Sequence, residues 1–391
     1  MNTLKTKAVF QPVRSHERIQ LMDALRGFAL FGILIVNSWS FSRYEWLPAD
    51  GRADGLLTDG LTILIDTKFV TIFSILFGAG FAIQRQRALA RGVGFGPFYV
   101  KRMALLFLIA CLHAYLLWFG DIVRHYALLG PALLLVGHLS ARATLRLSLL
   151  FILFLTPLVF ILNGVLPLRT APETIDEMPL PAFVFQSFTE GSYPRILRAN
   201  WIIDPLHNFI QDMPITLVSM FGKMLLGVWL AKIGFFRNPA DHQGRINRWL
   251  RAGGTLGLLS SVLYWAIKKG TLPMEEPWMA VVVFPVSGGL VLHSLFYLGL
   301  FVKLYHGPLG NRLLRFLAPV GRMGLTNYFG QTVLAFALFY GTGRIGRLMP
   351  EELLVWSLVI FFVQAIFSRW WLRRHEFGPV EWIWRRMAYL S

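Results

Sequence analysis

Long apolar runs separated by short charged segments dominate the chain and determine its predicted architecture. A helix needs about 20 apolar residues to cross a hydrocarbon core of about 30 Å. Ten runs approach this length, at residues 21–41, 61–83, 103–119, 122–139, 147–163, 206–235, 252–267, 279–302, 316–340 and 353–372. The pattern predicts an all-α polytopic membrane protein with about ten transmembrane helices.

The charged residues between the runs predict the side of the membrane on which each loop lies. Lys and Arg are concentrated in alternate loops, including 84–102, 236–251 and 369–386, whereas Asp and Glu are concentrated in the loops between them. Because cytoplasmic loops retain basic residues, we expect both termini to be cytoplasmic. Anionic headgroups also account for the net charge of +17, so we expect the lipid bilayer as the partner and no nucleic acid.

One membrane domain and two terminal segments make up the predicted organisation. Residues 1–18 form a cytoplasmic tail, 19–375 a helical membrane domain, and 376–391 a cytoplasmic amphipathic tail. Within the membrane domain, the proline-rich segment 164–205 predicts an irregular lid on the outer side. In the last segment, Arg385 and Arg386 lie among four apolar residues, which predicts a short helix at the membrane interface. These apolar residues are Trp382, Trp384, Met387 and Leu390.

Composition and missing motifs exclude several classes of protein and several kinds of site. Hydrophobic residues make up 55% of the chain and charged residues only 15%, which excludes a disordered or ordinary soluble protein. The single cysteine, Cys111, allows neither an internal disulfide nor a thiolate zinc site. Walker, metalloprotease and nucleophile-elbow motifs are missing from the sequence. We expect no metal and no permanently bound cofactor.

Ionisable residues inside the apolar runs are the first candidates for a site. Each costs about 2.5–3.5 kcal/mol at the centre of a membrane, so each should face a partner or a polar interior. These residues are Asp23, Arg26, Asp66, Lys68, Asp212, Lys223, Lys232 and Arg322. Asp23 and Arg26 can pair at the i,i+3 spacing, and Asn37 returns to nearly the same face three turns later. Lys232 lies near the end of its run and can extend to the interface.

A second polar stripe runs through residues 321–331. Arg322 and Thr326, and likewise Asn327 and Gln331, are four residues apart, so each pair shares a helix face. This pattern indicates either a binding site or a packing seam, and both interpretations remain open at this point. We predict one shared cavity for Asp23, Arg26, Asn37, Lys223, Arg322, Asn327 and Gln331, with Tyr328 among the substrate-binding residues.

His113, inside the third run, is the candidate general base, and Asp121 follows it by eight residues. A buried imidazole favours the neutral form that a base requires. The two side chains can meet only if the chain turns at Gly120, because eight residues of straight helix span about 12 Å. His125 is a rival partner for Asp121 near the outer surface. A purely structural histidine is the alternative for both His113 and His125.

Several motifs resemble the YeiB-like family of bacterial inner-membrane proteins, whose C-terminal half is a domain of unknown function. The similarity rests on the segments 21–37, 73–80, His113, 120–122, 321–328 and 378–382. The Asp23-Ala24-Leu25-Arg26-Gly27 opening also resembles the transmembrane acyltransferases. Those enzymes use cytoplasmic acyl-CoA, and their loop histidine has no counterpart in residues 42–60 of this chain. This resemblance implies an inner-membrane location and acyl transfer.

The leading hypothesis is a membrane-embedded acyltransferase with acyl-CoA as co-substrate and a lipid or glycan as acceptor. Arg26, Lys223 and Arg322 would contact the phosphates, His113 would take the acceptor's proton, and Asp121 would orient the site. A transporter or flippase is the alternative, since buried charges also line transport paths. A non-catalytic membrane scaffold is the third. The oligomeric state stays open.

Overall fold

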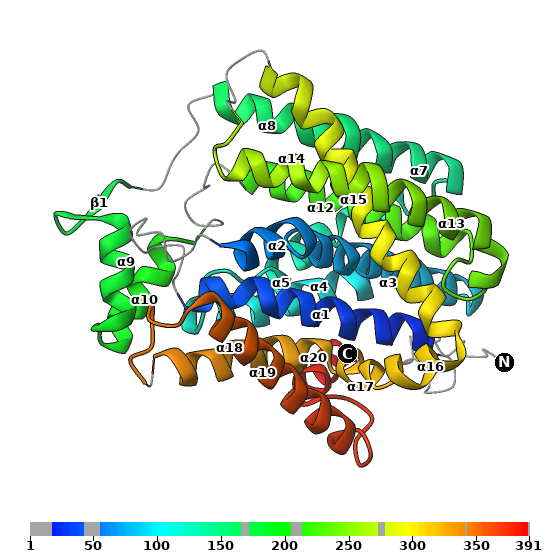
Figure 1. Ribbon diagram of the computed structural model, residues 1–391. Coiled ribbons are helices and arrows are strands. Elements are labelled where there is room, and N and C mark those ends of the chain that lie inside the picture. The colour runs from blue at the N-terminus through cyan, green and yellow to red at the C-terminus, as the bar shows by residue number, and fades with distance from the viewer. Residues whose placement is uncertain are drawn as a thin grey trace.

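The computed structural model describes residues 18–42, 55–165, 172–204, 213–272, 278–340 and 342–389. These residues form a helical bundle in which most helices run in one common direction (Figure 1). Within the described ranges, the strands are β1 (Thr174–Ile175) and β2 (Met178–Pro179), a short antiparallel pair. The predicted all-α class is confirmed.

In the described part of the chain, seven helical segments are long and apolar enough to cross a membrane. Each coincides with one of the ten predicted runs. Four of them are single helices, α1 (Gln20–Phe41), α4 (Gly96–Leu116), α12 (Met213–Lys232) and α19 (Pro350–Trp371). The segment Leu56–Ala90 comprises α2 (Leu56–Leu64) and α3 (Lys68–Ala90), and Ala141–Asn163 comprises α7 (Ala141–Leu150), the π-helical η3 (Phe151–Leu155) and most of α8 (Thr156–Val165). The seventh, Val281–His306, lies within α15 (Trp278–His306).

The other three predicted spans are interrupted or partly polar, so ten spans are not confirmed. The run 122–139 divides into α5 (Val123–Leu129) and α6 (Ala132–Val136), because Pro131 has no amide hydrogen to donate. The run 316–340 divides at Met323 into two helices, α17 (Leu317–Arg322) and α18 (Gly324–Phe339). The run 252–267 continues a helix that begins in a charged segment. This helix comprises α13 (Gln243–Ala252), η5 (Gly253–Gly257) and α14 (Leu258–Lys268), and shorter elements are η4 (Pro239–His242) and α16 (Pro308–Leu314).

Helix α1 lies inside the bundle and crosses α17 at backbone contact. A Cβ atom on Gly27 would lie 2.2 Å from the carbonyl oxygen of Leu317, and one on Gly321 would lie 1.8 Å from that of Asp23. Only glycine allows this approach, which is how membrane helices often associate. The crossing holds the arginine-bearing end of α17 against the first two turns of α1.

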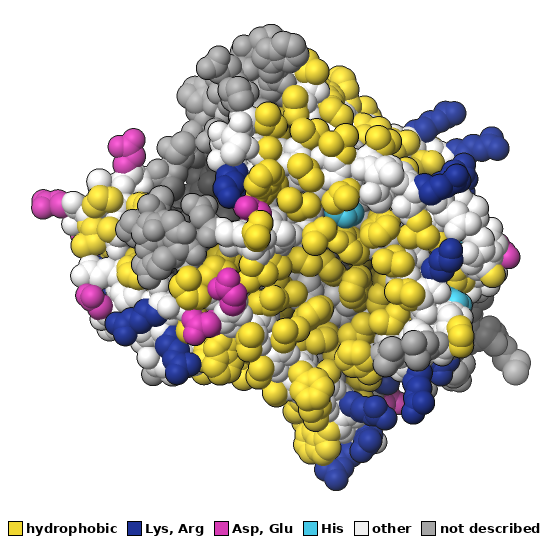
Figure 2. Space-filling view, in the orientation of Figure 1, with side chains coloured by type: hydrophobic (Ala, Val, Ile, Leu, Met, Phe, Trp, Pro, Cys, Tyr) yellow, Lys and Arg dark blue, Asp and Glu magenta, His cyan; other side chains and the backbone are white. Residues whose placement is uncertain are grey.

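A broad apolar surface surrounds the bundle. Figure 2 shows hydrophobic side chains over much of its middle, with most acidic side chains at the left and many Lys and Arg side chains at the right and lower edges. Exposed residues of α19, such as Val355, Phe362 and Ile366, and of η3 and α8, such as Phe154 and Leu162, contribute to this surface. Such a belt between two polar ends is expected where lipid covers the protein.

The segment 164–205, which we expect on the outer side and call the outer segment, is more ordered in its described part than predicted. Its described part contains the β1–β2 hairpin, α9 (Leu180–Thr189) and α10 (Tyr193–Ile202), which form a small unit at the left end of the bundle (Figure 1). Prolines begin both helices within their first turn, where the missing amide hydrogen costs nothing. The expectation of an irregular lid is wrong here. Asp212 and Leu390 lie outside the described residues.

Asp66 and Lys68 flank a break between α2 and α3. Thr67 adopts a left-handed conformation with φ of 69°, so the two side chains do not follow one helical register. Asp66 pairs with Lys268 at 2.9 Å, whereas Lys68 donates to the carbonyl of Thr62 at 3.3 Å. The polar residues of this run therefore have partners around the break. Lys232 likewise donates to the hydroxyl of Thr144 at 3.0 Å.

Candidate functional site

A cavity of about 300 Å³ lies between α1, α3, α4, the start of α5, the α17–α18 break and α20 (Pro379–Tyr389). Six guanidinium groups and two carboxylates line it. We call it the arginine cavity, and its charged lining residues are Arg18, Arg26, Arg87, Arg102, Arg322, Arg385, Asp23 and Glu381. The excess of positive charge predicts an anionic ligand, and guanidinium groups are well suited to phosphate.

Polarity changes along the axis of the arginine cavity. From Arg18, just before α1, the lining passes through Arg26 to Ile33, and on the antiparallel α3 it passes from Arg87 back to Phe73. The remaining apolar lining residues include Leu76, Phe77, Leu106, Ile122, Val123 and Tyr126. A cavity that is cationic at one end and apolar at the other fits an amphipathic anion.

Neighbouring groups hold several of the cavity arginines in place. Arg26 donates to Asp23 at 2.7 Å, the i,i+3 pair that the sequence predicts. Arg102 donates to the side-chain oxygen of Gln84 at 2.6 Å and lies over the indole of Trp384, with its guanidinium carbon 4.2 Å from the ring centroid. These contacts orient the guanidinium groups before any ligand arrives, which lowers the entropic cost of binding.

Helix α20 forms one wall of the arginine cavity. The Glu381 carboxylate accepts the backbone amides of Leu325 at 2.6 Å and Thr326 at 3.1 Å, at the start of α18. The indole of Trp384 donates to the carbonyl of Arg102 at 2.9 Å. Burial raises the pKa of Glu381 despite these hydrogen bonds. The predicted helix therefore forms, but it is docked on the bundle.

Only one face of α20 keeps the predicted interfacial character. Trp382 and Met387 are exposed, as expected for a helix at the membrane surface. Trp384 and Arg385 line the cavity instead. Burial, together with the charges of Arg102 and Arg18, lowers the pKa of Arg385 to about 10.

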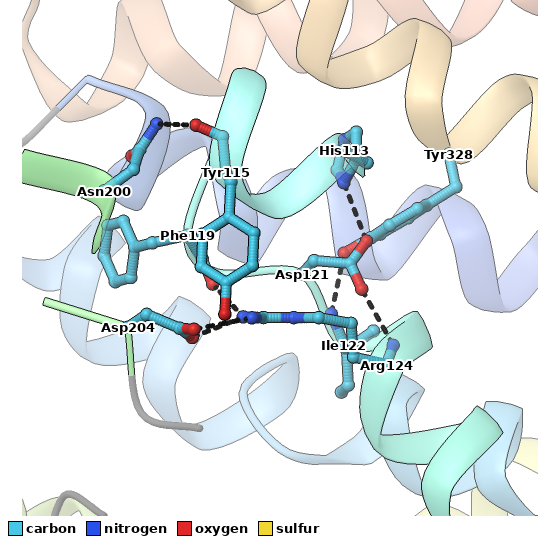
Figure 3. A network of polar contacts seen from close by, with 9 residues as sticks. All are labelled: His113, Tyr115, Phe119, Asp121, Ile122, Arg124, Asn200, Asp204 and Tyr328. Carbon is cyan, nitrogen blue, oxygen red and sulfur yellow. Dashed lines mark hydrogen bonds and ion pairs between the residues drawn. The ribbon is translucent and has the colours of Figure 1, made fainter. Parts of the chain in front are cut away.

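The His113–Asp121 cluster lies beyond the apolar end of the cavity. The chain turns after α4, and this turn brings Asp121 Oδ2 to 2.7 Å from His113 Nδ1 (Figure 3). Both side chains are almost completely buried. Asp121 Oδ1 accepts the backbone amide of Arg124 at 2.8 Å. The condition set by the sequence, a turn at Gly120, is met, and Asp121 pairs with His113.

His125 does not occupy the exposed position expected of it. It is buried, and its Nδ1 has no hydrogen-bond partner among the described residues. Its backbone amide donates to Ile122 at 3.1 Å. In the described part of the chain, the carboxylate of Asp121 forms its histidine hydrogen bond with His113.

Tyr328 separates the two parts of the site. It lines the arginine cavity, its hydroxyl accepts the amide of Ile122 at 3.2 Å, and its ring centroid is 5.7 Å from that of His113. Phe329 stacks on the imidazole, with the ring centroids 4.3 Å apart. His113 Nε2 is buried and lacks a hydrogen-bond partner among the described residues. Because a carboxylate accepts at Nδ1, Nε2 presents its lone pair.

The prediction of one shared cavity is correct for some residues and wrong for others. Asp23, Arg26 and Arg322 line the arginine cavity, together with Tyr328. The four predicted residues that do not line it are Asn37, Lys223, Asn327 and Gln331. Asn37 and Lys223 are half-buried on α1 and α12. Neither contributes to the cationic end.

Asn327 and Gln331 form a packing seam between α18 and α19. Asn327 donates to the hydroxyl of Ser368 at 2.9 Å and its carbonyl accepts from Gln364 at 2.8 Å. Gln331 donates to Gln364 Oε1 at 3.2 Å. Successive helical positions differ by about 100°, so one polar stretch faces two neighbours. Residues 321–331 are therefore both a cavity wall and a packing seam.

Comparison with known proteins relates the whole chain to a bacterial family. A model of a protein of unknown function (DUF418) matches residues 230–391. The uncharacterized protein YxaH of Bacillus subtilis is 31% identical over 97% of this chain and 96% of its own length. This chain belongs to the DUF418 family. The uncharacterized protein YeiB of Escherichia coli is 28% identical over 95% of the chain and 96% of its own length, which agrees with the YeiB-like motifs.

The DUF418 match covers only one part of the site. Residues 230–391 include Arg322, Tyr328 and Glu381, whereas His113 and Asp121 lie before them. The relatives extend over nearly the full chain and so cover both parts. Neither relative has an assigned activity in its name, so the function of this DUF418 protein is argued from the geometry of its site.

Several site residues could not be identified from sequence. Arg18, Arg87, Arg102 and Arg385 fall in segments whose positive charge predicts a cytoplasmic loop, and this topological interpretation already accounts for them. The available signal was Glu381, an acidic residue between two apolar ones, Val380 and Trp382. Its burial in the structure shows that this part of the tail is docked.

Proposed function

We propose that this protein is a membrane-embedded acyltransferase that takes acyl-CoA into the arginine cavity. The observation that carries the proposal is the polarity of this cavity, with six arginines at one end and an apolar interior that ends at Ile122 and Tyr328, next to the His113–Asp121 cluster. The phosphates of CoA match the cationic end. The acyl chain matches the apolar end, whose removal from water contributes about 0.8 kcal/mol for each CH₂ group.

The reaction follows from the free nitrogen of His113. His113 Nε2 takes the proton of an acceptor hydroxyl, and the hydroxyl oxygen attacks the thioester carbonyl. The new C–O bond forms, the C–S bond breaks, and the proton passes to the sulfur of CoA. Asp121 holds the imidazole through Nδ1 and stabilises its charged form. Tyr328 guides the acyl group at the boundary of the two parts.

The orientation that the sequence predicts is compatible with this donor. The arginine cavity lies at the end that carries Arg18 and Tyr389, near both ends of the described chain. We propose that both termini are cytoplasmic in a bacterial inner membrane, so that the cavity opens to the compartment that contains acyl-CoA. The acceptor would then be a lipid or glycan that reaches His113 from the membrane or the outer side.

Radiolabelled acetyl-CoA offers a direct test with inverted membrane vesicles that contain the protein. We expect the label to be transferred to extractable lipid or glycan by the wild type and by an Arg251→Gln control, since Arg251 is exposed on α13 outside the cavity. The Arg26→Gln, Arg322→Gln double variant should transfer far less at low acetyl-CoA. Equal transfer by vesicles that lack the protein would contradict the proposal.

A transporter or flippase is the second candidate, and the break at Met323 favours it. Helices α17 and α18 meet at this break, beside the cavity, and interrupted helices often surround transported solutes. An amphipathic anion would then leave unchanged. Proteoliposomes that accumulate or translocate labelled acyl-CoA without forming acylated product would favour this candidate over acyl transfer.

A further inference from the structure

The outer segment reaches the His113–Asp121 cluster through one buried ion pair. Arg124 donates to Asp204 with both terminal nitrogens, at 2.9 Å and 2.7 Å, and both side chains are fully buried. Asp204 follows α10, 80 residues after Arg124. Asn200, in α10, adds a hydrogen bond of 3.3 Å to the carbonyl of Tyr115. Arg124 lies in the first turn of α5 and Asp204 in the segment after α10, and neither side chain is exposed.

Arg124 closes the turn that carries Asp121. Its guanidinium donates to the carbonyl of Phe119 at 2.8 Å, while its own backbone amide donates to Asp121 Oδ1. The side chain thus connects the two ends of the segment 119–124, and Figure 3 shows Asp121 inside it. A rotation of the Arg124 side chain would release the turn and move Asp121 relative to His113.

Charge explains why Asp204 is needed at this position. Asp121 is the other nearby carboxylate that acts on Arg124. Without Asp204, the buried guanidinium would be attracted to Asp121 and would compete with His113 for it. A buried ion pair adds little net stability, because both groups lose their hydration. The contribution of this pair is orientation.

We propose that Asp204 is a positioning residue for the His113–Asp121 cluster, acting through Arg124 and the turn 119–124. The outer segment would thereby form part of the site. The catalytic consequence rests on the proposed function, whereas the positioning itself does not. An activity test and a test without substrate therefore separate the two.

The substrate-free test is ¹⁵N NMR of histidine-labelled protein in nanodiscs, with the His113 signals assigned by their loss in His113→Gln. We expect Asp204→Asn to shift the His113 Nδ1 signal, because the hydrogen bond to Asp121 lengthens. Asp176→Asn is the matched control. It breaks an ion pair with Arg198 in the same outer segment, which likewise has two contacts, at 2.6 Å and 2.8 Å, but is largely exposed. Its His113 signal should equal that of the wild type.

In the transfer assay, Asp204→Asn should lower kcat by about 10- to 100-fold and leave the KM for acetyl-CoA unchanged, because the arginine cavity is intact. Asp204→Glu should recover part of the loss. An unchanged kcat together with an unchanged His113 signal would overturn the proposal. A shifted His113 signal in Asp204→Asn, together with no acyl transfer by the wild type, would reject the acyltransferase and keep the positioning role.

Asp204→Asn leaves a buried charge without its partner and can prevent folding. The Arg124→Leu, Asp204→Leu double variant removes both charges and guards against that outcome. We expect it to accumulate in membranes with a shifted His113 signal. A wild-type signal in this variant would contradict the proposal. Loss of both variants from the membrane, with normal amounts of Asp176→Asn, would assign the pair to folding and also overturn it.

Discussion

The arginine cavity and the His113–Asp121 cluster use the same residue type in opposite ways. In the cluster, Arg124 is fully buried and its terminal nitrogens are taken up by Asp204 and by the carbonyl of Phe119. In the cavity, six arginines and two carboxylates surround an open volume of about 300 Å³. A buried, paired guanidinium holds the backbone in place, whereas a group of guanidiniums around a cavity can bind an anion.

This contrast separates chemistry from recognition. Changes in the cluster should act on the rate of reaction, and changes in the cavity should act on the affinity for the donor. The α18–α19 seam offers a third region, polar and buried, in which changes should act on stability alone. Four perturbations test this division.

The largest effect is expected at His113. His113→Gln should lower acyl transfer by about 10²- to 10⁴-fold, the usual range for the loss of a general base. His125→Gln removes the same ring from a buried position without a hydrogen bond to the Asp121 carboxylate. It should lose far less activity at equal membrane abundance. Equal activity of His113→Gln and the wild type would contradict the role of His113 as general base and favour the transporter.

The next effect concerns donor affinity. Each hydrogen bond to a charged group contributes about 1.5–3 kcal/mol, so the Arg26→Gln, Arg322→Gln variant should weaken acetyl-CoA binding by about 10²-fold or more. The kcat at saturating donor should change little. Isothermal titration in nanodiscs measures the affinity, with Arg251→Gln as the control. Unchanged affinity would show that the cavity does not bind the phosphates.

The seam should respond in stability without a change in binding. Gln331→Met removes the hydrogen bond to Gln364 and leaves Gln364 Oε1 without this donor. Hydrogen bonds between membrane helices contribute about 0.6 kcal/mol on average, with about 1.7 at most. The variant should therefore unfold at slightly lower denaturant concentration and bind acetyl-CoA normally. A large loss of affinity would place Gln331 in the binding site after all.

The smallest effect is the pH dependence of α20 docking. Burial raises the pKa of Glu381 above its ordinary 4.5, so the docked helix holds the proton more tightly than the undocked one. Its contribution to docking is fully present below pH 4.5 and is lost as the pH rises through the raised pKa. Hydrogen exchange of 379–389, corrected for intrinsic rates, should show this loss. In Glu381→Gln the dependence should disappear, and its persistence would exclude Glu381 as its cause.

The helical architecture was largely predictable, because the cost of placing polar groups in lipid requires long apolar runs, and these are visible in the sequence. Among the described residues, seven of the predicted runs meet the length and hydropathy of a span. The interruptions at Pro131 and Met323 could not be predicted from hydropathy, because both runs are apolar throughout most of their length. Proline and a single irregular residue change hydrogen bonding without changing apolar content.

The site was predictable only in part. Asp23, Arg26 and Arg322 were visible because charges inside apolar runs need an explanation. Asn327 and Gln331 have the same appearance in sequence, but their faces point at α19. Arg102 and Asp204 were hidden for the opposite reason, since charges in loops are ordinary. Only the tertiary arrangement shows that these two are needed inside.

The most direct test of the central claim is photolabelling with an acyl-CoA that carries a diazirine at the end of its acyl chain. The account predicts labelled peptides from the apolar end of the arginine cavity, around Phe77, Leu106 and Tyr328. Excess CoA should suppress this labelling, and so should the Arg26→Gln, Arg322→Gln substitutions. Label confined to exposed positions of α19, such as Phe362 and Ile366, and insensitive to CoA would contradict it.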